Sequence, residues 1–212
     1  MNYQNYKASR AAAWDVLIRH KVNSLPVKIS SICRAEGIVV SSYSKGAEII
    51  KALGFEESTR DNDGFAVSLL GKYYIFYDDS CTKQRQRFTV AHEYGHIVNG
   101  DVGEVPTNRN KEPSENDDSI ESGANIVASR ILAPACVLWA LKIQTAEEIA
   151  KLCDISIEAA RWRMQRLNLL YEREREFLKT KGRSCFLLSE KERMVYEQFL
   201  PFINEIKYQN QN

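Results

Sequence analysis

The stretch Arg87–Asp101, RFTVAHEYGHIVNGD, constrains this chain more than any other, because it carries two histidines and a glutamate in the order H-E-x-x-H. Its apolar residues recur on several sides, which predicts a helix buried over much of its surface. Residues four apart share one face of a helix, so His92 and His96 can direct two imidazoles at one cation. Glu93 lies about a quarter-turn away, where it can take a proton from a water on that cation without being a ligand.

The alternative interpretation is a buried helix whose histidines bond to neighbouring carbonyls. Burying His92, Glu93 and His96 costs desolvation energy, which is hard to explain unless the side chains are used. The same spacing suits zinc hydrolysis, because the metal lowers the pKa of its water to about 7 and the glutamate takes the proton. Gly95 lowers helix propensity but lets another backbone come close. The pattern therefore favours a metal site.

A catalytic zinc needs a third protein ligand and an open position. The only other histidine, His20, is interpreted as a partly exposed helix residue. The segment 119–134, SIESGANIVASRILAP, offers a carboxylate instead, on a second predicted helix rich in small residues. Its Glu121 and Asn125 are four residues apart, so Glu121 is the candidate ligand and Asn125 the candidate hydrogen-bond partner of a ligand. By spacing alone, Asp118-x-x-Glu121 fits a capping box equally well.

Periodicity and turn residues predict a mainly helical α+β chain. Helices are expected at 6–22, 26–37, 46–53, 82–98 and from about 118 to 134, and then to the end of the chain with breaks near Pro134, Asp154 and Gly182. A strand is expected at 38–43, and a hairpin at 65–77 with a two-residue type II′ turn at Gly71-Lys72. The segment 101–119 is expected to be a solvated acidic loop, with a lid as the alternative.

The bulk composition excludes several classes of protein. Among 212 residues, 29 are basic and 28 are acidic, so a polyanion could be bound only by a local patch. The five cysteines are widely spaced without a CxxC, which argues against disulfides and zinc ribbons. The N-terminus lacks the apolar core of a signal peptide, and no apolar run approaches the length of a membrane span. We expect a cytoplasmic monomer without membrane contact.

The segment 145–167, TAEEIAKLCDISIEAARWRMQRL, resembles a helix-turn-helix. Thr145 and Glu148 fit a capping box, and Ser156 fits the N-cap of the second helix. An apolar face is expected from Ala160, Met164 and Leu167. Three arginines could face phosphates or bases: Arg161, Arg163 and Arg166. Because Glu158 lies in the same helix and the chain is nearly neutral, we favour a helical pair packed on the catalytic domain over direct DNA binding.

The sequence indicates the residues that would contact a substrate less clearly than it indicates the metal ligands. A peptide could be held extended by adding to an edge of the predicted hairpin, where three tyrosines could touch it: Tyr73, Tyr74 and Tyr77. The alternative for each tyrosine is a half-buried strand residue. A tyrosine or an arginine is also expected to stabilise the oxyanion, but the sequence does not select one.

The two ligand segments resemble the ImmA/IrrE-type metallopeptidases of bacteria, their phages and integrative elements. That family's pattern runs approximately F-T-x-A-H-E-x-G-H and then E-x-E-A-N-x-F-A-x-x-L-L-x-P. The first part is matched by Phe88, Thr89, Ala91, His92, Glu93, Gly95 and His96, and the second by Glu121, Ala124, Asn125, Ala128, Leu132 and Pro134. Gly123 replaces a second glutamate and Val127 replaces the usual phenylalanine. The family uses the first glutamate as a ligand, which Glu121 retains.

The resemblance implies a thermolysin-like zinc peptidase core with a small, mostly antiparallel sheet, followed by a helix-turn-helix-like C-terminal helical region. It implies a peptidase domain at 1–140 and a helical region at 141–212. The implied activity is zinc-dependent cleavage of a helix-turn-helix repressor, which derepresses a mobile element or stress genes. The alternatives are a non-enzymatic regulator that binds DNA or a repressor, and a toxin paired with a neutralising partner.

Overall fold

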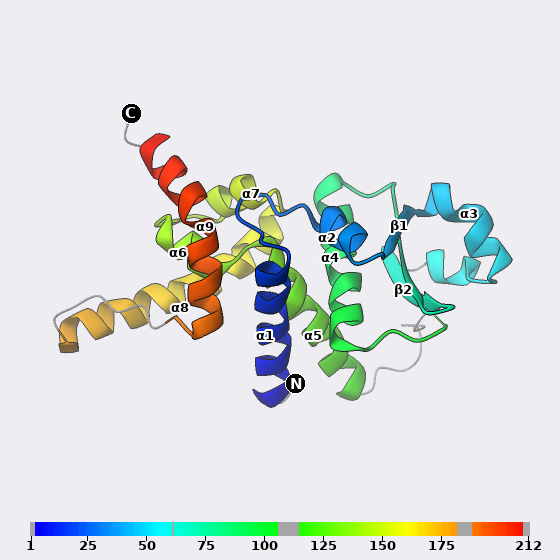
Figure 1. Cartoon of the computed structure of the whole chain (residues 1–212), viewed down its shortest axis with the longest axis horizontal. Helices are drawn as coiled ribbons and strands as arrows, with labels where there is room; N and C mark the ends of the chain where they lie inside the picture. Colours follow the sequence, from blue (N-terminus) through cyan, green and yellow to red (C-terminus); the bar gives the residue numbers. More distant parts are fainter. Residues whose placement is uncertain (1–2, 61, 106–114, 182–187, 210–212) are drawn as a thin grey trace. The chain divides into compact units, whose positions relative to one another are not determined.

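The computed structural model describes residues 3–60, 62–105, 115–181 and 188–209 (Figure 1). It is mostly helical with one small three-stranded sheet, which agrees with the predicted α+β class. Two compact units are distinguished by spatial proximity: Met1–Ala13 with Lys28–Ala128, and Trp14–Val27 with Ser129–Asn212. The predicted domains, 1–140 and 141–212, divide the chain differently and stay a prediction.

The first unit holds the sheet and the helices around it. Its elements are the start of α1 (Tyr3–Arg19), α2 (Ile29–Ala35), β1 (Val39–Ser42), α3 (Tyr43–Ala52), the short 3-10 helix η1 (Glu56–Thr59), β2 (Gly64–Leu69), β3 (Lys72–Tyr77), α4 (Lys83–Asn99) and most of α5 (Glu115–Leu132). The helix α4 packs against β2 and β3, as Figure 1 shows. The helix α2 begins at Ile29, so the prediction that Pro26 lies in its first turn is wrong.

The sheet has the strand order β1-β3-β2. β1 pairs with β3 in parallel and β2 pairs with β3 antiparallel, so the sheet is mixed. Leu69 pairs with Lys72, which makes Leu70 and Gly71 the two turn residues. Both have positive φ, 50° and 74°, which is a type I′ turn. The predicted type II′ turn at Gly71-Lys72 is wrong, because the strands pair one residue out of the predicted register.

One side of this sheet is filled by aromatic and β-branched residues. Phe65 and Phe76 pack with ring centroids 5.2 Å apart, and Val67 and Ile50 complete the cluster. Burial of these apolar side chains is the main term that holds α3 to the sheet. The sheet in turn fixes the position of α4, which carries the H-E-x-x-H residues.

The two helices that carry the H-E-x-x-H residues and Glu121 have well-defined ends where the structure describes them. Thr82 caps α4, since its side chain accepts a hydrogen bond from the Arg85 amide, and Gly100 ends it in the left-handed conformation. The helix α5 already includes Glu115, the first residue described after 105, so it extends farther toward the N-terminus than predicted. Asp118 and Glu121 therefore lie inside the helix, and the capping-box interpretation of this pair is wrong.

The second unit is helical where it is described. It contains the end of α1, α6 (Ala135–Ala140), α7 (Ala146–Cys153), α8 (Ile157–Lys181) and α9 (Glu190–Gln209). The chain breaks between α5 and α6 at Pro134 and between α7 and α8 at Asp154, as expected; Gly182 lies outside the described residues. The capping box of Thr145 and Glu148 is confirmed, and the Ser156 hydroxyl caps α8.

The arginines of α8 do not share one environment. The predicted apolar face, Ala160, Met164 and Leu167, is buried. Arg161 and Arg166 are exposed, but Arg163 is buried and its Nε donates to the Ala133 carbonyl over 2.7 Å. The prediction that Arg163 could face phosphates or bases is therefore wrong, because its guanidinium is used inside the protein.

One segment is long and apolar enough to cross a membrane by length and composition alone. It spans Asp118–Ala140 and corrects the expectation that no apolar run approaches this length. Buried residues make up 72% of its most apolar window, which is the pattern of a core helix in a water-soluble protein. This observation is weak evidence for a membrane span.

Candidate metal centre

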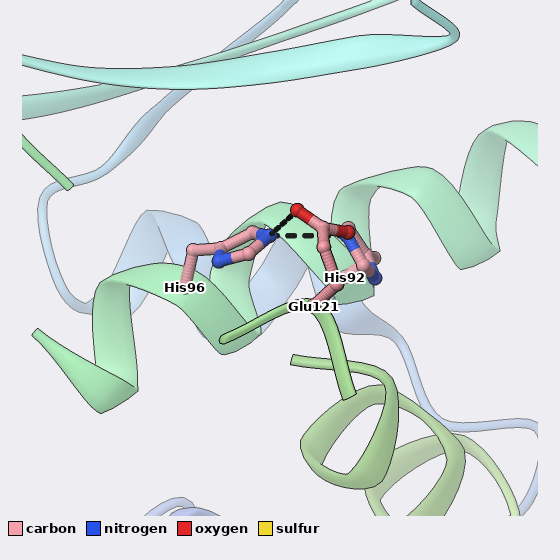
Figure 2. Close-up of side chains that lie close together, drawn as sticks. All are labelled: His92, His96 and Glu121. Atoms are coloured by element: carbon pink, nitrogen blue, oxygen red, sulfur yellow. Dashed lines mark hydrogen bonds and ion pairs between the residues drawn. The ribbon is translucent and has the colours of Figure 1, made fainter. Parts of the chain in front are cut away.

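The structure brings the two histidines of α4 and the glutamate of α5 together (Figure 2). The two Nε2 atoms of His92 and His96 lie 3.1 Å apart. The Glu121 carboxylate faces both rings, with Oε2 3.1 Å from His92 Nε2 and Oε1 3.3 Å from His96 Nε2. Both histidines are 7% exposed, so their rings are held within the protein. Three side chains from two helices thus converge on one point.

The other nitrogen of each ring faces an oxygen. His92 Nδ1 lies 3.0 Å from the Asn125 side-chain oxygen, and His96 Nδ1 lies 3.7 Å from Asp101 Oδ2. The Asn125 side-chain oxygen only accepts hydrogen bonds, so it favours the tautomer of His92 that carries its proton on Nδ1. In both rings Nε2 is the nitrogen that points at the other ring and at the Glu121 carboxylate.

This convergence fits a cation. Three donor atoms within 3.1–3.3 Å of one another are spaced as they would be around one cation. Zinc bonds of about 2.0–2.1 Å at tetrahedral angles set the donor atoms roughly 3.3 Å apart. The donor set of two imidazoles and a carboxylate is also one that zinc prefers. His92, His96 and Glu121 could therefore hold a metal ion.

Close approach of the two helices depends on a glycine. A Cβ on Gly95 would lie 2.8 Å from the Ala124 carbonyl oxygen and 3.0 Å from the Ala124 Cα. Both are backbone atoms, so the contact could be relieved only by moving a helix. Gly95 therefore allows Glu121, one turn before Ala124, to reach the histidines.

A cavity of about 430 Å³ opens beside the three side chains. Glu93, which is 3% exposed, lines it together with His92 and Glu121. The remaining lining residues are Asn62, Asp63, Gly64, Arg85, Phe88, Thr89 and Asn125. A group bound between the histidines and Glu121 would therefore share this cavity with the Glu93 carboxylate.

Asp101 is a site residue that its sequence context did not reveal, since it stands at the start of a segment whose composition is typical of a solvated acidic loop. After Gly100 the chain turns back, so that the Asp101 amide donates to the His96 carbonyl over 2.9 Å and the side chain faces the ring. Burial raises the pKa of the Asp101 carboxyl, and the neighbouring His96 opposes that rise. The glycine C-cap four residues after the candidate ligand His96 was the usable signal, because such a cap folds the next residue back onto the helix end.

The remaining candidate residues from the sequence are not among the three side chains that converge. His20 is partly exposed, as interpreted, but it lies just after α1 rather than within the helix, which ends at Arg19. The three tyrosines of the hairpin, Tyr73, Tyr74 and Tyr77, are half-buried in β3. β3 is the central strand, so the edge strand beside the cavity is β2 instead. Farther along that edge, the Ser68 amide donates to the Gly103 carbonyl over 2.8 Å. Of the acidic loop, residues 106–114 lie outside the described residues, and the lid interpretation stays a prediction.

Two of the described cysteines are poor candidates for metal binding or nucleophilic chemistry. Burial raises the pKa of the Cys33 and Cys136 thiols to about 12, which removes the thiolate that a metal or a nucleophilic reaction needs. Within the described part of the chain, four cysteines form no disulfide: Cys33, Cys81, Cys136 and Cys153.

A family comparison agrees with this geometry. A model of a peptidase family, described as the IrrE N-terminal-like domain, matches residues 33–165. The chain belongs to this family. The match covers the sheet, the H-E-x-x-H helix, the Glu121 helix and the first part of α8. No curated protein matches the chain significantly. Membership of the IrrE-like family indicates a metallopeptidase-type function.

Proposed function

We propose that this protein is a zinc-dependent endopeptidase. The observation that carries the proposal is the convergence of two imidazole Nε2 atoms and a carboxylate beside a buried glutamate in one cavity. Burying His92, His96 and Glu93 costs desolvation energy, and a bound cation gives that burial a use.

His92, His96 and Glu121 would hold the zinc. Zinc in such a site polarises the carbonyl and lowers the pKa of a coordinated water to about 7. Glu93 would accept the proton of the attacking water and pass it to the leaving amine. Asn125 and Asp101 would orient the two imidazoles through Nδ1, which keeps the Nε2 lone pairs directed at the metal.

The substrate would bind as an added strand along β2. Asp63 pairs with β3 through a hydrogen bond from the Asp78 amide to the Asp63 carbonyl, 2.7 Å long. Main-chain groups alternate in direction along an antiparallel strand, so those of Gly64 and Ala66 point away from β3. Gly64 also lines the cavity. A peptide paired with this edge would lie in extended form beside the zinc ligands.

We further propose that the substrate is a helix-turn-helix repressor and that the enzyme acts as a cytoplasmic monomer without a membrane partner. The resemblance to repressor-cleaving peptidases supports this substrate. Buried Arg163 removes one of the three arginines that a DNA-reading α8 would use. The protein substrate is therefore preferred over direct DNA binding as the regulatory contact.

The first experiment measures metal and activity together. Protein purified without added zinc should contain close to one zinc per chain, and it should cleave a helix-turn-helix repressor encoded beside its gene. Glu93→Gln should keep the zinc and lose cleavage by roughly 10²–10⁴-fold, because only the proton acceptor is removed. Protein that neither contains nor rebinds zinc would refute the metal site. Full cleavage by Glu93→Gln would refute the role of Glu93.

A further inference from the structure

The cavity continues past the metal ligands to a second polar group. Arg85 lies seven residues before His92 on α4, so the two side chains emerge on nearly the same face about 10 Å apart along the helix axis. Both line the cavity, with Phe88 between them. At that separation Arg85 cannot reach the carbonyl that reacts at the metal, so it is not the group that stabilises the oxyanion.

The Arg85 guanidinium is held in a fixed orientation by Asp63. Its Nε and Nη2 both contact Asp63 Oδ2. Asp63 is itself fixed, because its carbonyl accepts a hydrogen bond from the Asp78 amide at the start of the hairpin. The pair therefore joins the first turn of α4 to β2, and little side-chain entropy is left to lose when a ligand binds.

The Arg85–Asp63 pair leaves N–H donors of the Arg85 guanidinium available to a ligand in the cavity. The Arg85 side chain is 60% exposed and that of Asp63 is 36% exposed. Among the residues that the structure describes, none forms a hydrogen bond or an ion pair with Arg85 Nη1. A guanidinium with free N–H groups binds a carboxylate more strongly than a neutral acceptor. The exposed end of the pair therefore suits an acidic side chain.

We propose that Arg85, oriented by Asp63, is a specificity-determining residue that selects an Asp or Glu in the substrate. An extended peptide advances about 3.3 Å per residue, so about 10 Å corresponds to three residues from the cleaved bond. This inference rests on the proposed peptidase function and adds to it the class of substrate: a peptide with an acidic residue about three positions from the bond that is cut.

A library experiment tests the preference. Peptides made by digesting a bacterial lysate with a chymotrypsin-type protease are incubated with the zinc-loaded protein, and the new termini are mapped by mass spectrometry. We expect Asp and Glu to be enriched two to four residues from the cut bond, on one side. Cleavage with no acidic enrichment, or with Lys and Arg enriched there, would overturn the proposal.

Variants then assign the preference to Arg85. Three quenched peptides, identical except for Glu, Gln or Lys at the enriched position, are compared by kcat/KM. The wild type should prefer Glu over Gln by roughly fivefold, the size expected for a charge-assisted contact at a partly exposed site. Arg85→Gln should bring this ratio close to one, and Arg85→Glu should favour Lys. A ratio measured within one variant does not depend on how much of that variant is folded.

The control is Lys83→Gln, a neighbouring exposed cation on α4 that does not line the cavity. This variant should keep the wild-type ratio of kcat/KM for the Glu and Gln peptides. If its ratio fell as far as in Arg85→Gln, the positive charge of the surface in general, rather than Arg85, would set the preference. If the zinc-loaded wild type cleaves neither these peptides nor the helix-turn-helix repressor, the endopeptidase function itself fails. If it cleaves without regard to acidic residues, only the role of Arg85 fails.

Discussion

The helices α4 and α8 both carry polar residues at spacings typical of a functional surface, but the structure uses them differently. On α4, His92 and His96 are buried and face Glu121 from another helix. On α8, Arg161 is exposed, whereas Arg163 is buried against the Ala133 carbonyl. Spacing places side chains on a face of a helix, but what packs against that face decides their chemistry.

The difference lies in the partners. Each of the two histidines on α4 faces an oxygen with Nδ1 and directs Nε2 at a common point, which is the arrangement a metal ion needs. The buried guanidinium on α8 meets a carbonyl that needs a donor, which is a structural hydrogen bond. The following substitutions, from the largest expected effect to the smallest, test this contrast.

Removing a proposed zinc ligand should have the largest effect. His96→Ala should lose stoichiometric zinc and lower cleavage by roughly 10³-fold or more, because the metal supplies most of the charge stabilisation in such a site. Zinc analysis and a cleavage assay measure both. The matched control is His20→Ala, a partly exposed histidine that should leave both unchanged. Equal zinc content in the two variants would contradict the metal site.

Asp101→Ala should weaken zinc binding by about 10–100-fold, since an outer carboxylate fixes the ring of His96 and raises its basicity. Competition with a chromophoric zinc chelator measures the affinity. Asp101→Asn retains an acceptor oxygen and should restore part of the loss. Unchanged zinc affinity in Asp101→Ala would show that the carboxylate only caps the end of α4.

Gly95→Ala should destabilise the protein by about 1–3 kcal/mol, because its Cβ would meet the Ala124 backbone at 2.8 Å. Helix propensity alone predicts a gain of about 1 kcal/mol, so the sign separates the two effects. Urea unfolding gives the difference in free energy. Gly103→Ala, with no atom within 4 Å of the added Cβ, should change stability by less than about 0.5 kcal/mol. A stabilised Gly95→Ala variant would mean that the helices can separate at no cost.

Arg163→Ala should lower the free energy of unfolding by about 1–3 kcal/mol, since it leaves the buried Ala133 carbonyl without this donor. Arg161→Ala, exposed two residues earlier, should change it by less than about 0.5 kcal/mol. Chemical denaturation of both variants checks the pair. The contrary result would be DNA binding that depends on salt and is weakened by Arg161→Ala. It would show that α8 contacts nucleic acid, and so that α8, like α4, carries a functional surface.

The smallest effect is expected at the start of α7. The Gln144 amide donates to the Glu148 carboxylate, as do the amide and hydroxyl of Thr145, and these bonds lower the pKa of Glu148 from its ordinary 4.5. Because the folded pKa lies below the unfolded one, the stabilisation is complete above pH 4.5 and is lost as the pH falls through the folded pKa. Glu148→Gln should be about 0.5–1 kcal/mol less stable at pH 7 and indistinguishable from wild type in strong acid. A pH-independent difference in urea unfolding would contradict this origin.

The sequence predicted most local structure, because local signals decide it. Thr145 and Glu148 form their capping box, and Gly100 ends α4, since caps depend on a few neighbouring residues. The hairpin turn was predicted one residue too late, because Leu70 adopts a positive φ that its residue type disfavours. The pairing of β2 with β3 imposes that conformation on Leu70. The register of the two strands depends on contacts along their whole length, so the turn residues alone do not predict it.

The sequence by itself determined the pair of imidazoles, because the periodicity of a helix puts His92 and His96 on one face whatever surrounds it. Only the tertiary structure decided that Glu121 is inside a helix rather than at its cap, and that Asp101 returns to His96. It also decided that Arg163 is buried while Arg85 faces the cavity. These outcomes depend on which helices and strands pack against one another. The free energy that favours this packing comes from apolar burial throughout the core, so no short stretch of residues encodes it.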